Sequence, residues 1–430
     1  MSRRLFSLAR TLMGLVILAG LVWQPALADS PGPDTPLALQ PLIEEALAQN
    51  PEILAAREQV KALQERIPQA RALEDPELKI SLWNTPESLD VTRSARTIYG
   101  VAQRFPVPGV LARQEEVAVL TADRAARRLA AKEREVTEAV KIAYFELFWA
   151  HKALEIHEER VELVKQLFAV AQAKFRVGQG TQVDVLKAQV ELSTLLQQLS
   201  LLQQRKETAR AHLNTLLNRS PLAPLGVPRE PASHPTKLVF AQLEATALRE
   251  RPELREAKLA VDQWEAATKL AKLRMFPKLR VELQRWQNFN TDDGFGGNVT
   301  LNIPFAFWTK SKYDARVREA LARVRVARSK KALLENLTRF HIKDLLAQIH
   351  ATDQLLELYT TTVLPQAQQT RKAALAGYRV GRTGFLDLIE ADRAIVTYRL
   401  EFYRALVDRT QLLARLERVV GQPLDKGGRR

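Results

Sequence analysis

Two short, similar stretches decide how this chain is organised. Residues 175–184 read FRVGQGTQVD, and residues 378–387 read YRVGRTGFLD. Each begins with an aromatic residue, continues with Arg-Val-Gly and ends on an aspartate. The two stretches lie about 200 residues apart, whereas the units of solenoid proteins repeat every 20–50 residues or so. The pattern therefore predicts that one whole structural unit is duplicated in tandem.

Three further matches occur in the same order and at nearly the same spacing. The matched pairs are residues 42–53 with 243–254, 76–82 with 277–283, and 105–106 with 303–304. An ordered set of matches at one spacing is hard to obtain by chance, so it supports the duplication.

Each unit contains a segment with the period-two alternation of a β-strand. Apolar and charged residues alternate through residues 278–283. The stretch 292–297, rich in aspartate and glycine, then predicts a turn. We expect two strands in each unit, within about residues 76–106 and about residues 277–306. Each strand has one apolar and one polar face.

Very long helices follow the strands. No proline occurs between Leu111 and Ser220. Apolar residues recur there with heptad spacing from Val140 to Phe175, and only His157 interrupts the series with a polar side chain. Sustained heptads predict coiled-coil packing of an arm about 95 Å long. The second unit repeats this plan, with a kink expected at Pro365.

The N-terminus has the three parts of a secretory signal. Three arginines within the first ten residues are followed by an apolar core, Leu12 to Val22, and by the small residues Ala26 and Ala28. We expect cleavage after Ala28 and export of the mature chain. An uncleaved membrane anchor is the alternative.

Composition narrows the class of protein. The 430 residues are 46% hydrophobic and 26% charged, and the chain has no cysteine. Disulfides, thiolate metal sites and cysteine nucleophiles are therefore excluded. The six histidines show no metal-ligand spacing, and no P-loop or nucleophile motif occurs. We expect no enzyme, no cofactor and no metal site.

The formal net charge of +15 suggests an anionic partner. Because the chain is expected to be exported, anionic lipid is the candidate and nucleic acid is not. A cluster of basic residues from Lys310 to Lys331 stands out in the second unit. Solvated basic faces on long helices are the plainer interpretation of the same charge.

Four strands cannot close a membrane barrel, because about eight is the minimum. If the strands span a membrane, their edges must pair with other copies, and a trimer would supply twelve strands. Aromatic residues near the strand ends are typical of membrane girdles, although the core of a soluble sheet would also use them. They are Trp83, Tyr99, Phe105, Trp286, Phe289, Phe295, Phe305, Phe307 and Trp308.

The chain from about Leu37 to Leu424 resembles the TolC outer-membrane efflux family. The resemblance rests on the Asn-Pro-Glu and Arg-Pro-Glu helix starts at residues 50–52 and 251–253, on Val-Leu-Pro-Gln at 363–366, and on the two Val-Gly turns. Overall length and the short second-unit strands look closest to the heavy-metal, CzcC-like branch. The fold so implied is mainly α with transmembrane β, in which a trimer forms a twelve-stranded barrel and a periplasmic helical tunnel.

The resemblance implies a passive export duct in the outer membrane. It would be a homotrimer that docks a periplasmic adaptor protein and an inner-membrane pump of the resistance-nodulation-division class, with heavy-metal cations as candidate cargo. The alternative is a periplasmic coiled-coil scaffold without a pore. The expected divisions are a signal peptide (1–28), a lead (29–36), the first repeat (37–219), a linker (220–237), the second repeat (238–424) and a tail (425–430).

The resemblance also implies two sets of functional residues. The hairpin tips that would contact the adaptor are Val177, Gly178, Gln179, Val380, Gly381 and Arg382. The alternative for the two glycines is an ordinary helix-ending role. The carboxylates that would narrow the tunnel entrance are Asp387 and Glu390, one helical turn apart, together with Asp184. Surface carboxylates without a gating role are the alternative for these.

Overall fold

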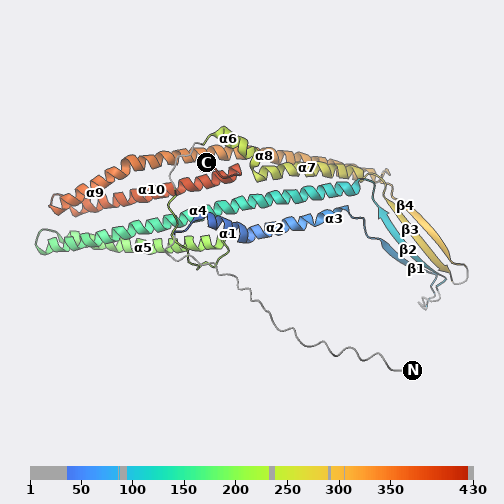
Figure 1. Ribbon diagram of the computed structural model, residues 1–430, viewed down its shortest axis with the longest axis horizontal. Coiled ribbons are helices and arrows are strands. Elements are labelled where there is room, and N and C mark those ends of the chain that lie inside the picture. The colour runs from blue at the N-terminus through green and yellow to red at the C-terminus, as the bar shows by residue number, and fades with distance from the viewer. Residues whose placement is uncertain are drawn as a thin grey trace, which may run out of the picture.

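The structure is a computed structural model of the 430-residue chain. It describes residues 36–85, 87, 94–231, 238–288, 292–304 and 306–424. The expected signal peptide, nearly all of the lead, the tail and part of the linker lie outside the described residues, as do Phe289 and Phe305. The molecule is elongated: helices run along its length, and the four strands of one sheet lie together at one end (Figure 1).

The two units follow the same plan: short helices, two strands, and then a long helical hairpin. The first contains α1 (Leu39–Gln49), α2 (Pro51–Gln64), α3 (Arg66–Arg71), β1 (Glu77–Trp83), β2 (Arg96–Phe105), α4 (Val110–Arg176) and α5 (Gln182–Leu216). The second contains α6 (Phe240–Glu250), α7 (Pro252–Leu273), β3 (Leu279–Asn288), β4 (Gly294–Leu301), α8 (Lys310–Leu358), η2 (Tyr359–Val363), α9 (Leu364–Arg379) and α10 (Phe385–Val420). None of the helices within the described residues is both long enough and apolar enough to cross a membrane.

The helix starts predicted at the two prolines are present. Pro51 and Pro252 occupy the first positions of α2 and α7, where a missing N–H costs nothing. At the first of them, Asn50 caps the helix by accepting a hydrogen bond from the Glu52 N–H at 3.0 Å. The Asn50 amide also donates to the carbonyl of Leu216 at 2.9 Å, which fixes the end of α5 beside the start of α2.

The predicted long arm corresponds to α4, a helix of 67 residues, or about 100 Å at 1.5 Å per residue. Most of its heptad residues, though not Phe175, are buried, and a core cluster joins Val161 and Val164 of α4 to Phe385 and Leu388 of α10. His157 is buried on this seam, and its Nδ1 lies 3.0 Å from the carbonyl oxygen of Ala153. Coiled-coil packing of the arms is thus confirmed.

The disturbance predicted at Pro365 takes the form of a π-helical turn. This turn, η2, lies between α8 and α9 and ends two residues before the proline. Proline cannot donate a backbone hydrogen bond, and its ring crowds the carbonyl of the preceding turn. One extra residue in that turn relieves the crowding without ending the helix.

The strands form a single antiparallel sheet in the order β1-β2-β3-β4. The pairing of β2 with β3, from Arg96↔Asn288 to Phe105↔Leu279, joins the two units. One face of the sheet is apolar and exposed, through Leu78, Ile80, Val101, Leu283, Phe295 and Val299. β1 and β4 are the edges, and neither has an outer partner in the part of the chain that the structure describes.

The opposite face of the sheet is polar and rich in ion pairs. Glu77 pairs with Arg104 at 2.7 Å and with Arg280 at 2.8 Å, and Lys79 pairs with Glu282 at 3.5 Å. These contacts link three strands across the sheet. The charged residues that alternate with apolar ones in the sequence therefore lie on one face of the sheet and form ion pairs with one another there.

The turn predicted at residues 292–297 is partly wrong, because β4 already begins at Gly294. The side chain of Trp286 lies flat over β4 at this point. A Cβ on Gly294 would come within 2.5 Å of that indole, and one on Gly296 within 2.2 Å. These glycines allow close packing inside the sheet instead of forming the turn.

Candidate functional site

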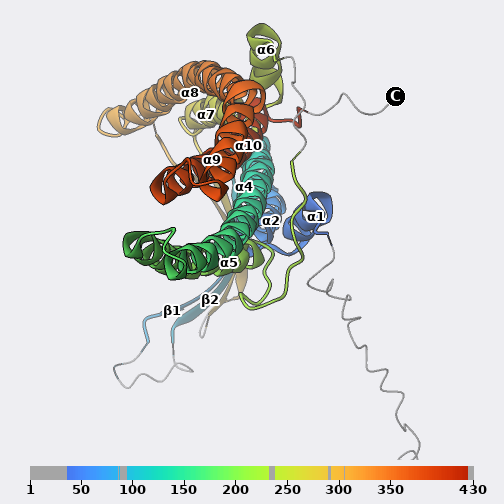
Figure 2. The same ribbon diagram turned by 90° about the vertical axis from the view of Figure 1, so that its left-hand side faces the viewer.

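The two Val-Gly turns lie at the end of the molecule farthest from the sheet, and Figure 2 views the molecule from that end. They have the same backbone geometry. Gly178 has φ of +74° and Gly381 has φ of +76°. A Cβ placed on either glycine would meet nothing within 4 Å. The backbone conformation therefore favours glycine, while the space around both turns is open.

Hydrogen bonds of the helix-ending type close both turns. The N–H of Gln179 donates to the carbonyl of Lys174 at 2.8 Å, and the N–H of Arg382 donates to the carbonyl of Gly377 at 2.8 Å. Val177 and Val380 project outward with 68% and 70% of their surface exposed. Each predicted tip thus presents an exposed apolar side chain on a hydrogen-bonded turn.

The bases of the two tips are in contact. Lys174 of α4 donates to the carbonyl of Tyr378 at 2.5 Å and lies 4.3 Å from the centre of the Tyr378 ring. Tyr378 is buried against Phe385. Burial, with a smaller effect of the Asp184 charge, raises the pKa of Tyr378. The structure therefore brings the two tips of one chain together.

The predicted acidic residues follow these turns, and two of them, Asp184 and Asp387, cap the helices that begin there. Asp184 forms a capping box at the start of α5: its N–H donates to Thr181 Oγ1 at 3.2 Å, and its carboxylate accepts from the Thr181 N–H at 3.3 Å. Asp387 accepts from the Gly384 N–H at 3.2 Å at the start of α10. Asp387 and Glu390 are exposed, and Asp184 is half-buried.

A buried charge cluster between the hairpins is absent from the sequence predictions. Arg160 of α4 donates to Glu191 of α5 at 2.6 Å and to Asp392 of α10 at 3.0 Å. Arg393 also binds Glu191, and Arg371 of α9 lies 3.7 Å from Asp392. Burial raises the pKa of Asp392, and the two neighbouring arginines oppose that shift. Four helices of both units meet at this cluster.

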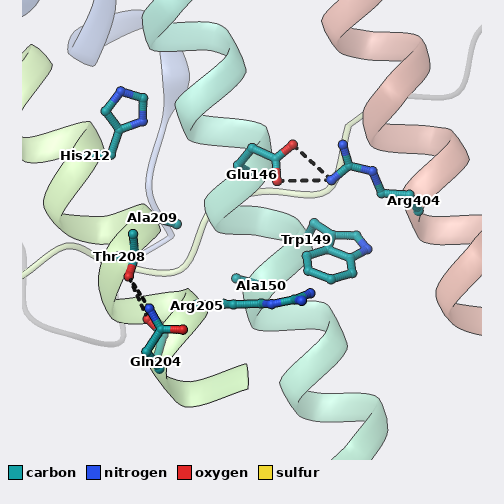
Figure 3. A pocket seen from close by; sticks show the side chains of 9 residues that line it. All are labelled: Glu146, Trp149, Ala150, Gln204, Arg205, Thr208, Ala209, His212 and Arg404. Atoms are coloured by element: carbon teal, nitrogen blue, oxygen red, sulfur yellow. Dashed lines mark hydrogen bonds and ion pairs between the residues drawn. The ribbon is translucent and has the colours of Figure 1, made fainter. Parts of the chain in front are cut away.

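A cavity of about 600 Å³ lies farther from the tips, between α4, α5 and α10 (Figure 3). Trp149 stands there between two guanidinium groups, 5.9 Å from Arg205 and 5.7 Å from Arg404. Glu146 forms an ion pair with Arg404 at 2.9 Å. The cavity combines an aromatic ring with fixed charges. Across the described ranges, no group of three or more acidic or histidine side chains is arranged to hold a metal ion.

Comparison with known proteins gives consistent matches. The family model of the outer membrane efflux protein matches residues 42–219 and 243–422. The cobalt-zinc-cadmium resistance protein CzcC of Cupriavidus metallidurans is 23% identical over 394 residues, which is 90% of each chain. The solved structure of CusC superposes with a TM-score of 0.75 at 18% identity and covers 89% of this chain and 92% of that chain.

The outer membrane protein VceC from Vibrio cholerae superposes equally well, with a TM-score of 0.75 at 16% identity, and the match covers 90% of this chain and 97% of that chain. These likenesses confirm the predicted fold of duplicated long helical hairpins with a small sheet. The predictions of an efflux family and of an outer-membrane location are confirmed as well. The chain belongs to the outer membrane efflux protein family.

Proposed function

We propose that this protein is the passive duct of a tripartite efflux system, a homotrimer that docks a periplasmic adaptor and an inner-membrane pump of the resistance-nodulation-division class. The observation that carries the proposal is a four-stranded sheet with two open edges and an exposed apolar face, set at one end of helices about 100 Å long. The trimer performs no chemistry of its own, and the pump supplies the energy.

The open sheet supports closure with other copies of the chain. Unpaired edges carry free N–H and C=O groups, which cannot remain unsatisfied in lipid. In a ring with threefold symmetry, β1 of one copy pairs with β4 of the next, and no edge remains. The apolar face then turns to lipid, while the ion pairs around Glu77 and Glu282 line the lumen.

The helices support the same ring. In Figure 2 they form an arc from α5 through α4 and α10 to α8, with α1 and α6 on its convex side. Apolar side chains remain exposed at both ends of the arc, which is unusual for a surface that faces water alone. They are Leu196 and Leu201 on α5 and Leu355 and Leu358 on α8, all 18 to 26 residues along the chain from the glycine of the nearer Val-Gly turn. In a trimer these two ends would cover each other.

The tips are proposed as the adaptor-docking surface, and Asp387 with Glu390 as the narrow entrance of the tunnel. Support for docking is the exposure of Val177 and Val380 on turns with open surroundings. Support for the entrance is the position of the exposed carboxylates directly after one of these turns. Three copies would gather six carboxylates there and attract cations.

Heavy-metal cations are the proposed cargo. The CzcC relative is named for cobalt, zinc and cadmium resistance, and an acidic entrance suits cations. In this proposal the metal passes through the duct without a resident site. The signal peptide, lead, linker, repeat and tail boundaries given above belong to the same proposal. The scaffold alternative is disfavoured because it leaves the apolar sheet face in water.

Labelling of single introduced cysteines tests the proposal. The natural chain contains no cysteine, so no other residue reacts with a thiol reagent. Ile80→Cys lies on the apolar face of the sheet and Ser81→Cys on the polar face. In the membrane-inserted protein, Ile80→Cys should resist a water-soluble maleimide and react with a lipid-soluble one, whereas Ser81→Cys should react with the water-soluble reagent. Rapid labelling of both by the water-soluble reagent would favour the scaffold.

A further inference from the structure

An exposed aromatic pair lies between the sheet and α8. Phe307 and Trp308 follow β4, and 85% and 70% of their surfaces are exposed. Their rings are 4.5 Å apart in an edge-to-face arrangement. Leu301 and Ile303, just before them, are exposed as well. Exposed apolar side chains therefore continue from the end of β4 to the segment just before α8.

Three exposed cations follow at once, namely Lys310, Lys312 and Arg316. None of them forms an ion pair with a carboxylate in the part of the chain that the structure describes. Lys312 and Arg316 lie 5.9 Å and 5.6 Å from the centre of the Tyr313 ring, on either side of it in the sequence. Asp314 is the one acidic residue of the sequence from 306 to 318.

Several basic residues farther along α8 differ, because carboxylates neutralise them. Arg323 pairs with Glu319 at 2.9 Å, Arg328 with Glu265 at 2.7 Å, and Lys331 with Glu335 at 2.6 Å. The cations next to the sheet are therefore available to an external anion. Their position beside exposed aromatic rings is the arrangement found where a protein leaves a bilayer.

We propose that Phe307, Trp308, Lys310, Lys312, Tyr313 and Arg316 form a collar that binds the phosphate groups of anionic phospholipids in the periplasmic leaflet. This inference rests on the proposed function, since it requires the sheet to lie in the membrane. The aromatic rings sit at headgroup depth, and the flexible cations reach the phosphates. A trimer repeats the collar three times around the channel.

The test measures which lipids accompany the protein. The full protein is inserted in phosphatidylcholine vesicles that contain about one-quarter phosphatidylglycerol, an anionic lipid. A styrene–maleic acid copolymer then extracts the protein with its surrounding lipids, which are quantified. Phosphatidylglycerol should be enriched at low salt, and the enrichment should fall as ionic strength rises.

The collar variant carries Lys310→Gln, Lys312→Gln and Arg316→Gln. Its matched control carries Arg325→Gln, Lys330→Gln and Lys343→Gln, which removes the same charge from exposed positions farther along α8. Roughly a threefold or greater loss of enrichment is expected in the collar variant alone, given the attraction of each basic residue to an anionic surface. Equal enrichment in both variants would overturn the collar.

Two further readouts separate the alternatives. If inorganic phosphate stabilises the detergent-solubilised protein against heat and the collar variant loses that response, the collar is a free-phosphate site and the lipid proposal is wrong. Channel conductance is recorded on the same samples. If the channels conduct normally but phosphatidylglycerol is not enriched, only the lipid-binding collar is contradicted. If no channels form, the proposed function as an export duct is contradicted as well.

Discussion

The guanidinium of Arg160 donates to the carboxylate of Asp392 across 3.0 Å and thereby joins α4 of the first unit to α10 of the second. Asp392 is only 1% exposed, and Arg160 and Glu191 are buried with it. Removing charges from water is costly, and mutual pairing offsets that cost only while every partner is present. Arg160 neutralises two carboxylates and is therefore the critical member of the cluster.

Replacement of this arginine should destabilise the protein strongly. Arg160→Met leaves Asp392 without its nearest cation, and the expected cost is about 3–5 kcal/mol, seen as a lower midpoint of thermal unfolding. Arg399→Met is the control, because Arg399 also links α10 to α4, through Glu159 at 2.6 Å, but at the surface. That pair should contribute about 0–1 kcal/mol. Equal losses in the two variants would contradict the role of the cluster.

His151 should make stability depend on acidity. Burial, followed by the charge of Lys206, lowers the pKa of His151 from 6.5 to about 4. Between these two values the unfolded chain binds a proton that the folded chain does not, so stability falls as the pH drops through this window. Unfolding midpoints measured from pH 7 to pH 4.5 should fall more for the natural protein than for His151→Gln. Parallel curves would show that this histidine is not responsible.

The tips should be essential for export but not for assembly. Gly381→Leu forces a branched side chain into a left-handed conformation that costs roughly 1–2 kcal/mol, and it fills the open space at the turn. We expect normal oligomers and no export. Val380→Glu changes the exposed surface without a positive φ and should also impair export. Export at the natural rate in both variants would remove the docking role.

The acidic pair should set ion selectivity. Asp387→Asn with Glu390→Gln removes both charges, and asparagine can still accept the hydrogen bond from Gly384. Reversal potentials across a salt gradient should show a lower preference for cations. The control, Glu158→Gln with Glu357→Gln, removes the same charge elsewhere and should change nothing. An unaltered preference in the first variant would leave these residues with only a structural role.

Much of the fold could be predicted from the sequence because its signals are local and repeated. The heptad pattern predicted the long helix α4, and the alternation at residues 278–283 predicted strand β3. The paired Val-Gly turns predicted the duplication. The misassigned glycines show the limit of this reasoning. In the sequence Gly294 looks like a turn residue. Only the structure shows that the Trp286 side chain packs over it, so that glycine is needed inside the strand.

The buried cluster was missed for a related reason. Arg160 and Asp392 are far apart in the sequence and belong to different units, and neither has a charged counterpart in the other repeat. Heptad spacing identifies the apolar face of a helix but does not identify which helices meet. The same holds for Trp149, whose two arginine neighbours come from α5 and α10.

The most direct measurement is the conductance of the purified mature protein in a planar lipid bilayer. A trimeric duct predicts discrete current steps that favour cations, from protein recovered in the outer-membrane fraction. Persistent absence of steps, together with recovery of the protein from the soluble periplasm, would contradict the central claim that these sheets close into a channel.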